Sequence, residues 1–352
     1  MALLKFNNIG IKAISACVPK EIRSNKDLSY LIPDEEIDKV INSIGIEERR
    51  YADTLTTASD LCEKAARKLF ESNEDFDLSE VDALIFVSQT SDYHQPATAP
   101  LLQHKLGIPD TCLCFDINLA CSGYVYGLAT AFSFAQQESI RNVLLLVGET
   151  MSKTVSQYDK VSTPLFGDAG TATLIGKGDF GESVFSLHSD GAGSEVIKMK
   201  YGGYRHPSSP EGFIEHTDEE GNKRTGEQFY MNGMDVFNFG VRVEPRDIKN
   251  LMKEVGITAD ELDLLVYHQA NKFMTDFFTK KLKVSPEKTP YSLRKYGNTS
   301  SASIPLTISS EMATGDYPNR EKSILTGFGA GLSWGSVFID LSKTQINPVI
   351  EF

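Results

Sequence analysis

The sequence contains an internal repeat, whose two copies read EVDALIFVSQT at residues 80–90 and ELDLLVYHQAN at residues 261–271. Both copies open with Glu-apolar-Asp, continue through four apolar residues and end on small or polar residues. This pattern is typical of a buried strand that leads into a turn or a helix. A helical pattern precedes each copy, at residues 58–72 and 246–256. The repeat therefore predicts a chain built from two similar halves.

The correspondence continues downstream of both strands. LLQHKLGIPDT at 101–111 and FFTKKLKVSPEKT at 277–289 each predict a helix that ends before a turn containing proline. CFDINLACSGYVYGLATA at 114–131 then matches YSLRKYGNTSSASIPLTI at 291–308, each predicted as a strand followed by a helix of small residues. Any two strand–helix units look alike, but four consecutive elements in the same order favour a duplicated α/β half.

Strands that alternate with helices predict largely parallel sheets that are buried on both faces. We therefore expect an α/β protein of two similar halves, residues 1–180 and 181–352, packed together. Residues 200–228 are rich in glycine, proline and charge and show little periodicity. They predict an excursion over the surface within the second half.

Composition narrows the class of protein. The chain has 352 residues, of which 41% are hydrophobic and 24% charged, as in soluble globular proteins. Its formal net charge of −13 argues against nucleic acid as the main partner, because phosphate binding needs a basic face. No apolar run approaches the ~20 residues that cross a bilayer. Lys5 and Lys12 interrupt the apolar N-terminus, so we expect neither a signal peptide nor a membrane span, but a cytoplasmic protein.

The cysteines point to neither disulfides nor a metal site. Their odd number in a reducing compartment argues against a disulfide framework. Zinc sites use a C-x2-C pair with a second pair of ligands, whereas Cys112 and Cys114 are spaced i, i+2 and no second pair is visible. We therefore expect no metal and no resident cofactor. The cysteines are Cys17, Cys62, Cys112, Cys114 and Cys121.

Three residues follow predicted strands, where reactive groups gather in parallel sheets. Cys121 follows CLCFDI and precedes a helix, His268 follows LDLLVY, and Asn298 follows the Tyr296-Gly297 turn. His268 alone is equally well a core histidine, and Asn298 alone is equally well a helix cap. Their occurrence at matching positions with Cys121 is the reason to assign all three to one site.

Cys121 is the predicted nucleophile. A thiol at a helix N-terminus is stabilised as thiolate by the helix dipole and by free N–H groups. Ala120, Ser122 and Gly123 leave space for a substrate. The alternative is a buried structural cysteine, which we prefer for the other four. GFGAGLSWG at 327–335 lacks the helix of a dinucleotide-binding motif, so we interpret it as a tight bend whose N–H groups face the site.

At these residues the chain resembles the β-ketoacyl-[acyl-carrier-protein] synthase III family. The matching segments follow the family's order along nearly the whole chain. They are ACSGYVYGL around Cys121, ETMSK, LFGDAGTA, MNGMDVF, HQANK at His268, YGNTSSASIP at Asn298, and FGAGLSWGS.

The resemblance implies a thiolase-like, five-layered αβαβα fold and a homodimer. It also implies a catalytic triad of Cys121, His268 and Asn298, with an oxyanion hole formed by the backbone N–H groups of Cys121 and Ala330. In the implied reaction Cys121 takes an acyl group from a thioester. Malonyl-carrier protein then loses CO2 and attacks the acyl group in a Claisen condensation, giving a 3-oxoacyl thioester in fatty acid or related acyl-chain biosynthesis. The implied partners are an acyl thioester and acyl carrier protein.

Some positions depart from the family's pattern. The tryptophan and two arginines with which the family holds coenzyme A align with Lys39, Ser43 and Phe273, and a pocket phenylalanine contributed across the dimer aligns with Gln95. These departures remove a stacking surface and two guanidinium groups that would pair with phosphate. They leave open both the acyl chain and the choice between coenzyme A and carrier protein as donor.

Two other activities remain as alternatives at this stage. A thiolase-fold acyltransferase would move the acyl group from Cys121 to an alcohol or amine, but this transfer gives no role to Asn298. A cysteine hydrolase is more remote: the order Cys, His, Asn suits papain-like proteases, but their sequence around the cysteine is absent.

Overall fold

A computed structural model of the chain describes residues 2–73 and 76–352. Its main sheet is mixed and has ten strands. The helices are α1 Asp34–Ile44, α2 Ala58–Glu71, α3 Thr98–Leu106, α4 Gly123–Ala135, α5 Gly233–Glu254, α6 Lys272–Leu282, α7 Leu293–Tyr296 and α8 Ser303–Met312. The strands of the main sheet are β1 Ala2–Val18, β4 Val81–Val87, β5 Leu113–Ile117, β6 Asn142–Thr150, β7 Asp168–Ser189, β12 Leu264–Tyr267, β13 Ser323–Gly329, β14 Ser333–Ile339, β15 Gln345–Ile346 and β16 Ile350–Glu351.

The shorter strands form three separate pairs. They are β2 Ile22–Ser24 with β3 Glu48–Arg50, β8 Ile197–Lys198 with β11 Tyr230–Met231, and β9 His216–Thr217 with β10 Lys223–Arg224.

The sequence repeat is also a repeat of topology. In the first half β4, β6, β7 and β1 are neighbours in that order, and in the second half β12, β13, β14 and β7 are. The first pair of each set is parallel and the next two pairs are antiparallel. The expectation of largely parallel sheets is therefore wrong. β7 in the first half and β14 in the second half each follow the preceding strand without a crossover helix, so each pairs with that strand in the antiparallel direction.

β7 belongs to both sets of strands. Residues 168–176 of β7 pair with β6, and residues 184–189 pair with β14. β1 runs antiparallel to β7 along most of its length. The predicted boundary between residues 1–180 and 181–352 falls inside this strand. The division into two halves therefore remains a prediction made from the sequence repeat.

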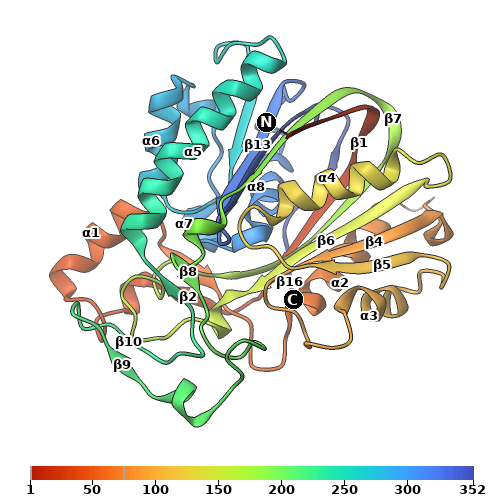
Figure 1. Ribbon diagram of the computed structural model, residues 1–352. Helices are drawn as coiled ribbons and strands as arrows, with labels where there is room; N and C mark the ends of the chain where they lie inside the picture. The colour runs from red at the N-terminus through yellow and green to blue at the C-terminus, as the bar shows by residue number, and fades with distance from the viewer. Residues whose placement is uncertain (1, 74–75) are drawn as a thin grey trace.

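The elements stack in five layers. The outer helices α2 and α3 pack on the first half of the sheet through Leu61, Leu69 and Leu102, all fully buried. The helices α5 and α6 cover the second half through Ile248 and Phe278. Between the halves lie α4 and α8, whose side chains share one core with strands of both. Figure 1 shows α4 on one face of the β4–β5–β6 strands and α2 and α3 on the other.

Two local predictions need correction. The run YSLRKY at 291–296 forms no strand but includes the short helix α7. Gln269 accepts the N–H of Ser292 with its side-chain oxygen at 3.3 Å, in place of a neighbouring strand. The helical pattern predicted at 246–256 belongs to the longer helix α5, which begins at Gly233, is capped by Asn232 and contains Pro245 in its middle. The helix tolerates this proline although the residue removes one N–H donor.

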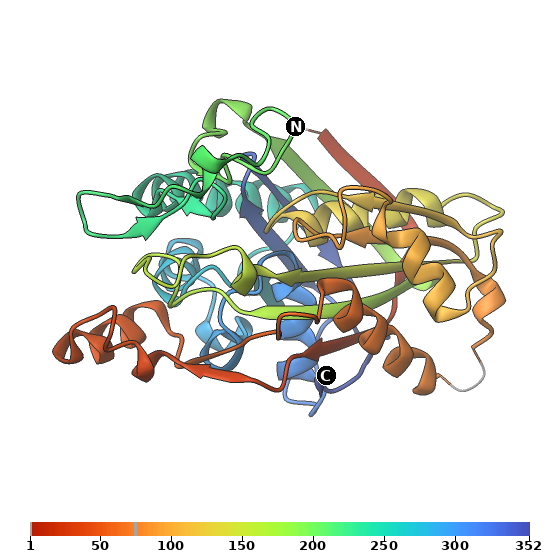
Figure 2. The ribbon, with the colours of Figure 1, turned by 90° about the horizontal axis from the view of Figure 1, so that it is seen from below.

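Residues 200–228 form a loop excursion, as predicted, which contains the 3₁₀ helix Pro210–Phe213 and the short strands β9 and β10. Figure 2 shows this excursion on the same side of the molecule as α1, away from α2 and α3. Within residues 2–73 and 76–352, no helix is long and apolar enough to cross a membrane.

Candidate active site

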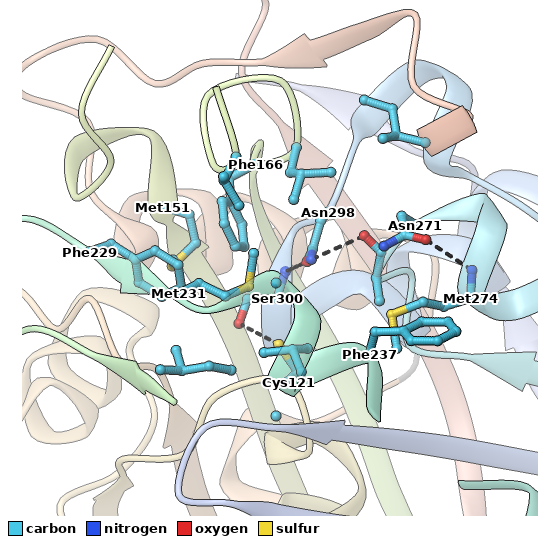
Figure 3. Close-up of a pocket in the computed structure, with 18 of the residues that line it drawn as sticks. Cys121, Met151, Phe166, Phe229, Met231, Phe237, Asn271, Met274, Asn298 and Ser300 are labelled. Atoms are coloured by element: carbon cyan, nitrogen blue, oxygen red, sulfur yellow. Dashed lines mark hydrogen bonds between the residues drawn. The ribbon is translucent and has the colours of Figure 1, made fainter. Parts of the chain in front are cut away.

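The structure brings Cys121, His268 and Asn298 into one cavity of about 560 Å³ (Figure 3). Cys121 lies between β5 and α4, and His268 follows β12 directly. Asn298 lies between α7 and the 3₁₀ turn Ser300–Ala302, which leads into α8. Because α4 and α8 form the layer between the halves, their N-terminal ends meet at the same place.

Two glycines allow β13 to pass close to Cys121. A Cβ added to Gly329 would lie 2.8 Å from Cys121 Cβ, and one added to Gly327 would lie 2.7 Å from the Cys121 carbonyl oxygen. Either contact is too short for two non-bonded atoms. The expected tight bend comprises residues 330–332 between β13 and β14, and Ala330 lines the cavity. Within the described residues, the backbone N–H groups of Cys121 and Ala330 donate to no other residue.

The Cys121 thiol differs from the sequence-based expectation of an acidic thiol. Part of the residue faces the cavity, but burial of the sulfur raises the pKa of the thiol to about 12. The Ser300 hydroxyl opposes this shift, and the nearby Glu149 adds to it. The helix begins only at Gly123, two residues after the cysteine, so the N-terminal effect of α4 does not outweigh burial.

His268 is held as a neutral donor. Burial lowers the pKa of its imidazole to about 3, and the Ser300 backbone opposes the shift. Nδ1 lies 2.8 Å from the Ser303 hydroxyl, which accepts the Gln269 N–H at 3.2 Å. The hydroxyl hydrogen is then available to Nδ1, which leaves the imidazole proton on Nε2. This is the ring nitrogen that can donate to a substrate.

Asn298 is fixed in its turn from three directions. Its backbone N–H donates to the Leu165 carbonyl at 2.8 Å, and its Oδ1 accepts the Ser300 N–H at 2.8 Å. Nδ2 donates to the Ala270 carbonyl at 3.4 Å (Figure 3). An amide nitrogen has two hydrogens, so one remains for a substrate oxygen.

Comparison with known proteins decides the family. The protein-family model described as 3-Oxoacyl-[acyl-carrier-protein (ACP)] synthase III matches residues 115–193, and the family model of the C-terminal part of these enzymes matches residues 252–341. A relative from Caldanaerobacter subterraneus subsp. tengcongensis, named β-ketoacyl-[acyl-carrier-protein] synthase III, is 33% identical over 95% of this chain and 98% of its own. The chain belongs to the 3-oxoacyl-[acyl-carrier-protein] synthase III family.

Other members agree with this assignment in sequence and in fold. The β-ketoacyl-[acyl-carrier-protein] synthase III of Rhodopirellula baltica is 34% identical over 93% of this chain and 97% of its own. The crystal structure of a 3-oxoacyl-(acyl-carrier protein) synthase from Burkholderia xenovorans LB400 superposes with a TM-score of 0.92. That protein is 34% identical and covers 100% of this chain and 99% of its own. A papain-like hydrolase is excluded by this family and fold.

In this member of the 3-oxoacyl-[acyl-carrier-protein] synthase III family, the inner cavity wall is apolar. Met151, Phe166 and Phe229 are each at most 6% exposed, and they gather on one side of Cys121 and Ser300 (Figure 3). Ile197 on β8 and Met231 on β11 complete this wall. The sequence did not predict the contribution of β8 and β11 to this wall. These strands flank the excursion at 200–228, and two residues are too few to show the alternation of a strand.

The cavity mouth of this synthase III member is apolar as well. Val40 on α1 and Phe237 on α5 line it together with Phe273, whose ring centroid lies 5.5 Å from that of Phe237. Met234 and Phe273 are 68% and 57% exposed. Lys39 and Ser43 are exposed on α1. Gln95 lies in an exposed loop and does not line this cavity.

Proposed function

We propose that this 3-oxoacyl-[acyl-carrier-protein] synthase III carries an acyl group on Cys121 and condenses it with malonyl-carrier protein, assisted by His268 and Asn298. Family membership makes the chain an acyltransferase of fatty acid or related acyl-chain synthesis. The observation that carries the assignment of roles is the meeting of these three side chains in one apolar cavity.

In the first half-reaction the Cys121 sulfur attacks the thioester carbonyl, and the thiol of the donor leaves. The backbone N–H groups of Cys121 and Ala330, which have no other acceptor in the described residues, support a role as donors to the oxyanion. The acyl group then enters the apolar chamber beside Met151 and Phe229. Forming acyl-Cys121 divides the condensation into two easier steps.

In the second half-reaction malonyl-carrier protein loses CO2, and negative charge develops on its thioester oxygen. The Nε2–H of His268 and the remaining Nδ2 hydrogen of Asn298 donate to this oxygen. A neutral His268 suits this role, because a charged imidazolium would protonate the carbanion. The carbanion attacks the acyl carbonyl, and the Cys121 sulfur leaves. The apolar walls keep water away from the carbanion.

Intact mass spectrometry tests the proposed function directly. The protein is incubated with an acyl thioester, then with malonyl-carrier protein, and both proteins are weighed. We expect one acyl mass on the enzyme, its loss on addition of malonyl-carrier protein, and a 3-oxoacyl mass on the carrier. Transfer of the acyl group to an added alcohol or amine, without CO2 release, would instead support the alternative acyltransferase.

The apolar mouth supports a donor other than acetyl-coenzyme A. Coenzyme A carries phosphates and an adenine. Val40, Phe237 and Phe273 supply no positive charge for the phosphates, and the tryptophan with which the family stacks on coenzyme A is absent from the mouth. Three lysines near the mouth, Lys39, Lys160 and Lys272, could bind the phosphates of coenzyme A as point charges. Lys272 already forms an ion pair with Asp276, which leaves Lys39 and Lys160. Loss of stacked and bidentate contacts weakens binding by about tenfold or more.

A donor panel measures this preference. We expect kcat/KM for acetyl-coenzyme A to lie about tenfold or more below that of longer apolar acyl donors, at least some of them on carrier protein. Phe273→Arg restores a guanidinium at the mouth and should improve coenzyme A donors selectively, without changing carrier-protein donors. Clear superiority of acetyl-coenzyme A in the unmodified enzyme would contradict the proposed donor.

A basic face over α5 and α6 supports docking of acidic acyl carrier protein to this acidic enzyme. Lys280 and Lys281 are exposed on α6, and Lys281 Nζ donates to the Val241 carbonyl of α5 at 3.2 Å. Four basic residues of α5 are spaced four, three and four positions apart, as on one face of a helix, and all four are exposed: Arg242, Arg246, Lys249 and Lys253.

Charge reversal tests the basic face. The Lys280→Glu/Lys281→Glu variant should raise KM for malonyl-carrier protein about threefold to tenfold at low salt, and less at high salt, because salt screens exposed charges. The control Lys20→Glu/Lys64→Glu changes the net charge equally at exposed positions elsewhere. An unchanged KM in the first variant, or an equal rise in both, would remove this face from the docking site.

We also propose that the enzyme is a homodimer, as the family resemblance implies. β5 is the last strand of its sheet path, and its pairing edge faces no other strand in the described residues. Leu113 at its start is 42% exposed, and Phe115 is only partly buried. A second copy would cover this edge. Light scattering should then report twice the 38.9 kDa of one chain.

A further inference from the structure

A serine hydroxyl lies beside the Cys121 sulfur, in the turn that follows Asn298. Ser300 Oγ is 3.6 Å from Cys121 Sγ (Figure 3). Ser300 is fully buried and has a φ of +50°, in the left-handed region that residues with a side chain rarely adopt. This backbone conformation lets one residue serve two neighbours: its N–H donates to Asn298 Oδ1 at 2.8 Å, and its hydroxyl faces the sulfur. Strain of this kind persists where the surrounding contacts impose it.

The direction of the hydroxyl hydrogen follows from a third residue. Gln89 Nε2 donates to Ser300 Oγ at 2.8 Å. An amide nitrogen can only donate, so it occupies a lone pair of the oxygen and leaves the single hydroxyl hydrogen for another acceptor. Within the described residues, the Cys121 sulfur is the other polar contact of this oxygen.

Gln89 is itself held in place. Its backbone N–H donates to the Glu149 carboxylate at 3.2 Å, and its amide nitrogen also lies 3.3 Å from Met151 Sδ. Glu149, at the end of β6, accepts the Ser301 hydroxyl at 2.7 Å as well. One buried carboxylate thus ties the loop of Gln89 to the turn of Ser300.

We propose that Ser300 is a further catalytic residue, whose hydroxyl donates a hydrogen bond to the Cys121 thiolate, and that Gln89 is the positioning residue that directs this hydrogen. The inference rests on the proposed role of Cys121 as nucleophile. Charge on a buried sulfur needs a donor, and the helix start lies too far along the chain to supply it alone. When the sulfur is acylated its charge disappears, and the hydroxyl is free to turn away.

Alkylation of Cys121 by iodoacetamide, followed by peptide mapping, tests the donor without any acyl substrate. Ser300→Ala should slow alkylation about tenfold to hundredfold, the range for losing a hydrogen bond to a charged group. The variant keeps the backbone N–H that donates to Asn298 Oδ1. Gln89→Leu leaves the strained Ser300 backbone intact and should slow alkylation about threefold to tenfold.

The neighbouring Thr299 provides a matched control. It is also fully buried in this turn, and its Oγ1 has no hydrogen-bond partner in the part of the chain that the structure describes. Thr299→Val should alkylate at the unmodified rate. Alkylation of Ser300→Ala at the unmodified rate, or equal slowing in Thr299→Val, would overturn the proposal. If the unmodified enzyme never forms acyl-Cys121, the proposed function fails, while the alkylation rates still decide whether Ser300 stabilises the sulfur.

Discussion

Replacement of Cys121 by alanine is expected to abolish acyl-enzyme formation and to lower 3-oxoacyl synthesis by at least ~10³-fold, as losing a nucleophile does in other enzymes. No acyl mass should appear on this variant with any thioester donor. Cys121→Ser should also be severely impaired, because a hydroxyl in the same buried place is a much weaker nucleophile. Intact mass spectrometry after incubation with the donor makes the measurement.

Cys114 provides the control for the assignment of Cys121 as the acyl acceptor. Cys114 on β5 is, like Cys121, partly exposed, whereas Cys17, Cys62 and Cys112 are buried, so Cys114 is the residue to exclude as an acyl acceptor. Cys114→Ala should acylate normally. An acyl group that maps to Cys114, or full activity in Cys121→Ser, would contradict the assigned nucleophile.

Replacement of His268 or Asn298 by alanine should lower decarboxylation of malonyl-carrier protein by ~10²–10³-fold, the typical effect of losing one preorganised oxyanion donor. Both variants should still form acyl-Cys121, because acylation uses the backbone donors at Cys121 and Ala330. Release of labelled CO2 and the mass of the acyl-enzyme measure the two half-reactions separately. Normal decarboxylation with failed acylation would reverse the proposed roles.

Asn298 needs a more conservative variant, because its Oδ1 also accepts the Ser300 N–H. Asn298→Asp keeps this acceptor and removes only the amide donor. It should therefore acylate Cys121 as well as Asn298→Ala or better, while its decarboxylation stays low. Equal loss of both half-reactions in the two variants would instead indicate that Asn298 holds the turn in place and does not donate to the substrate.

The sequence predicted the parts of the site that lie next to the ends of regular elements. Strand periodicity and the repeat placed Cys121 and His268 at strand ends, and the structure brings both into one cavity with Asn298. The glycines of the 327–335 segment were also informative, because Gly327 and Gly329 are the positions where a Cβ would meet Cys121.

Other features depend on tertiary contacts that leave no local pattern. Ser300 is one of several small polar residues in NTSSAS, and only the backbone at φ +50° turns its hydroxyl toward the sulfur. Gln89 reaches Ser300 across 211 residues of sequence. The thiol was expected to be acidic from its place near a helix start, but burial, which depends on the whole cavity, has the larger effect on its pKa.

The shared strand β7 has a consequence for how the chain folds during synthesis. β1, the first strand to be made, pairs with residues 170–187 of β7 and, at its other edge, with β15 and β16 near the C-terminus. Contacts between such distant segments give a high contact order and slow folding. A nascent chain that stops at residue 180 lacks the part of β7 that joins the second half, and β1 then has partners for only part of its length. The sequence repeat resembles two separate modules, but neither half is expected to fold ahead of the other on the ribosome.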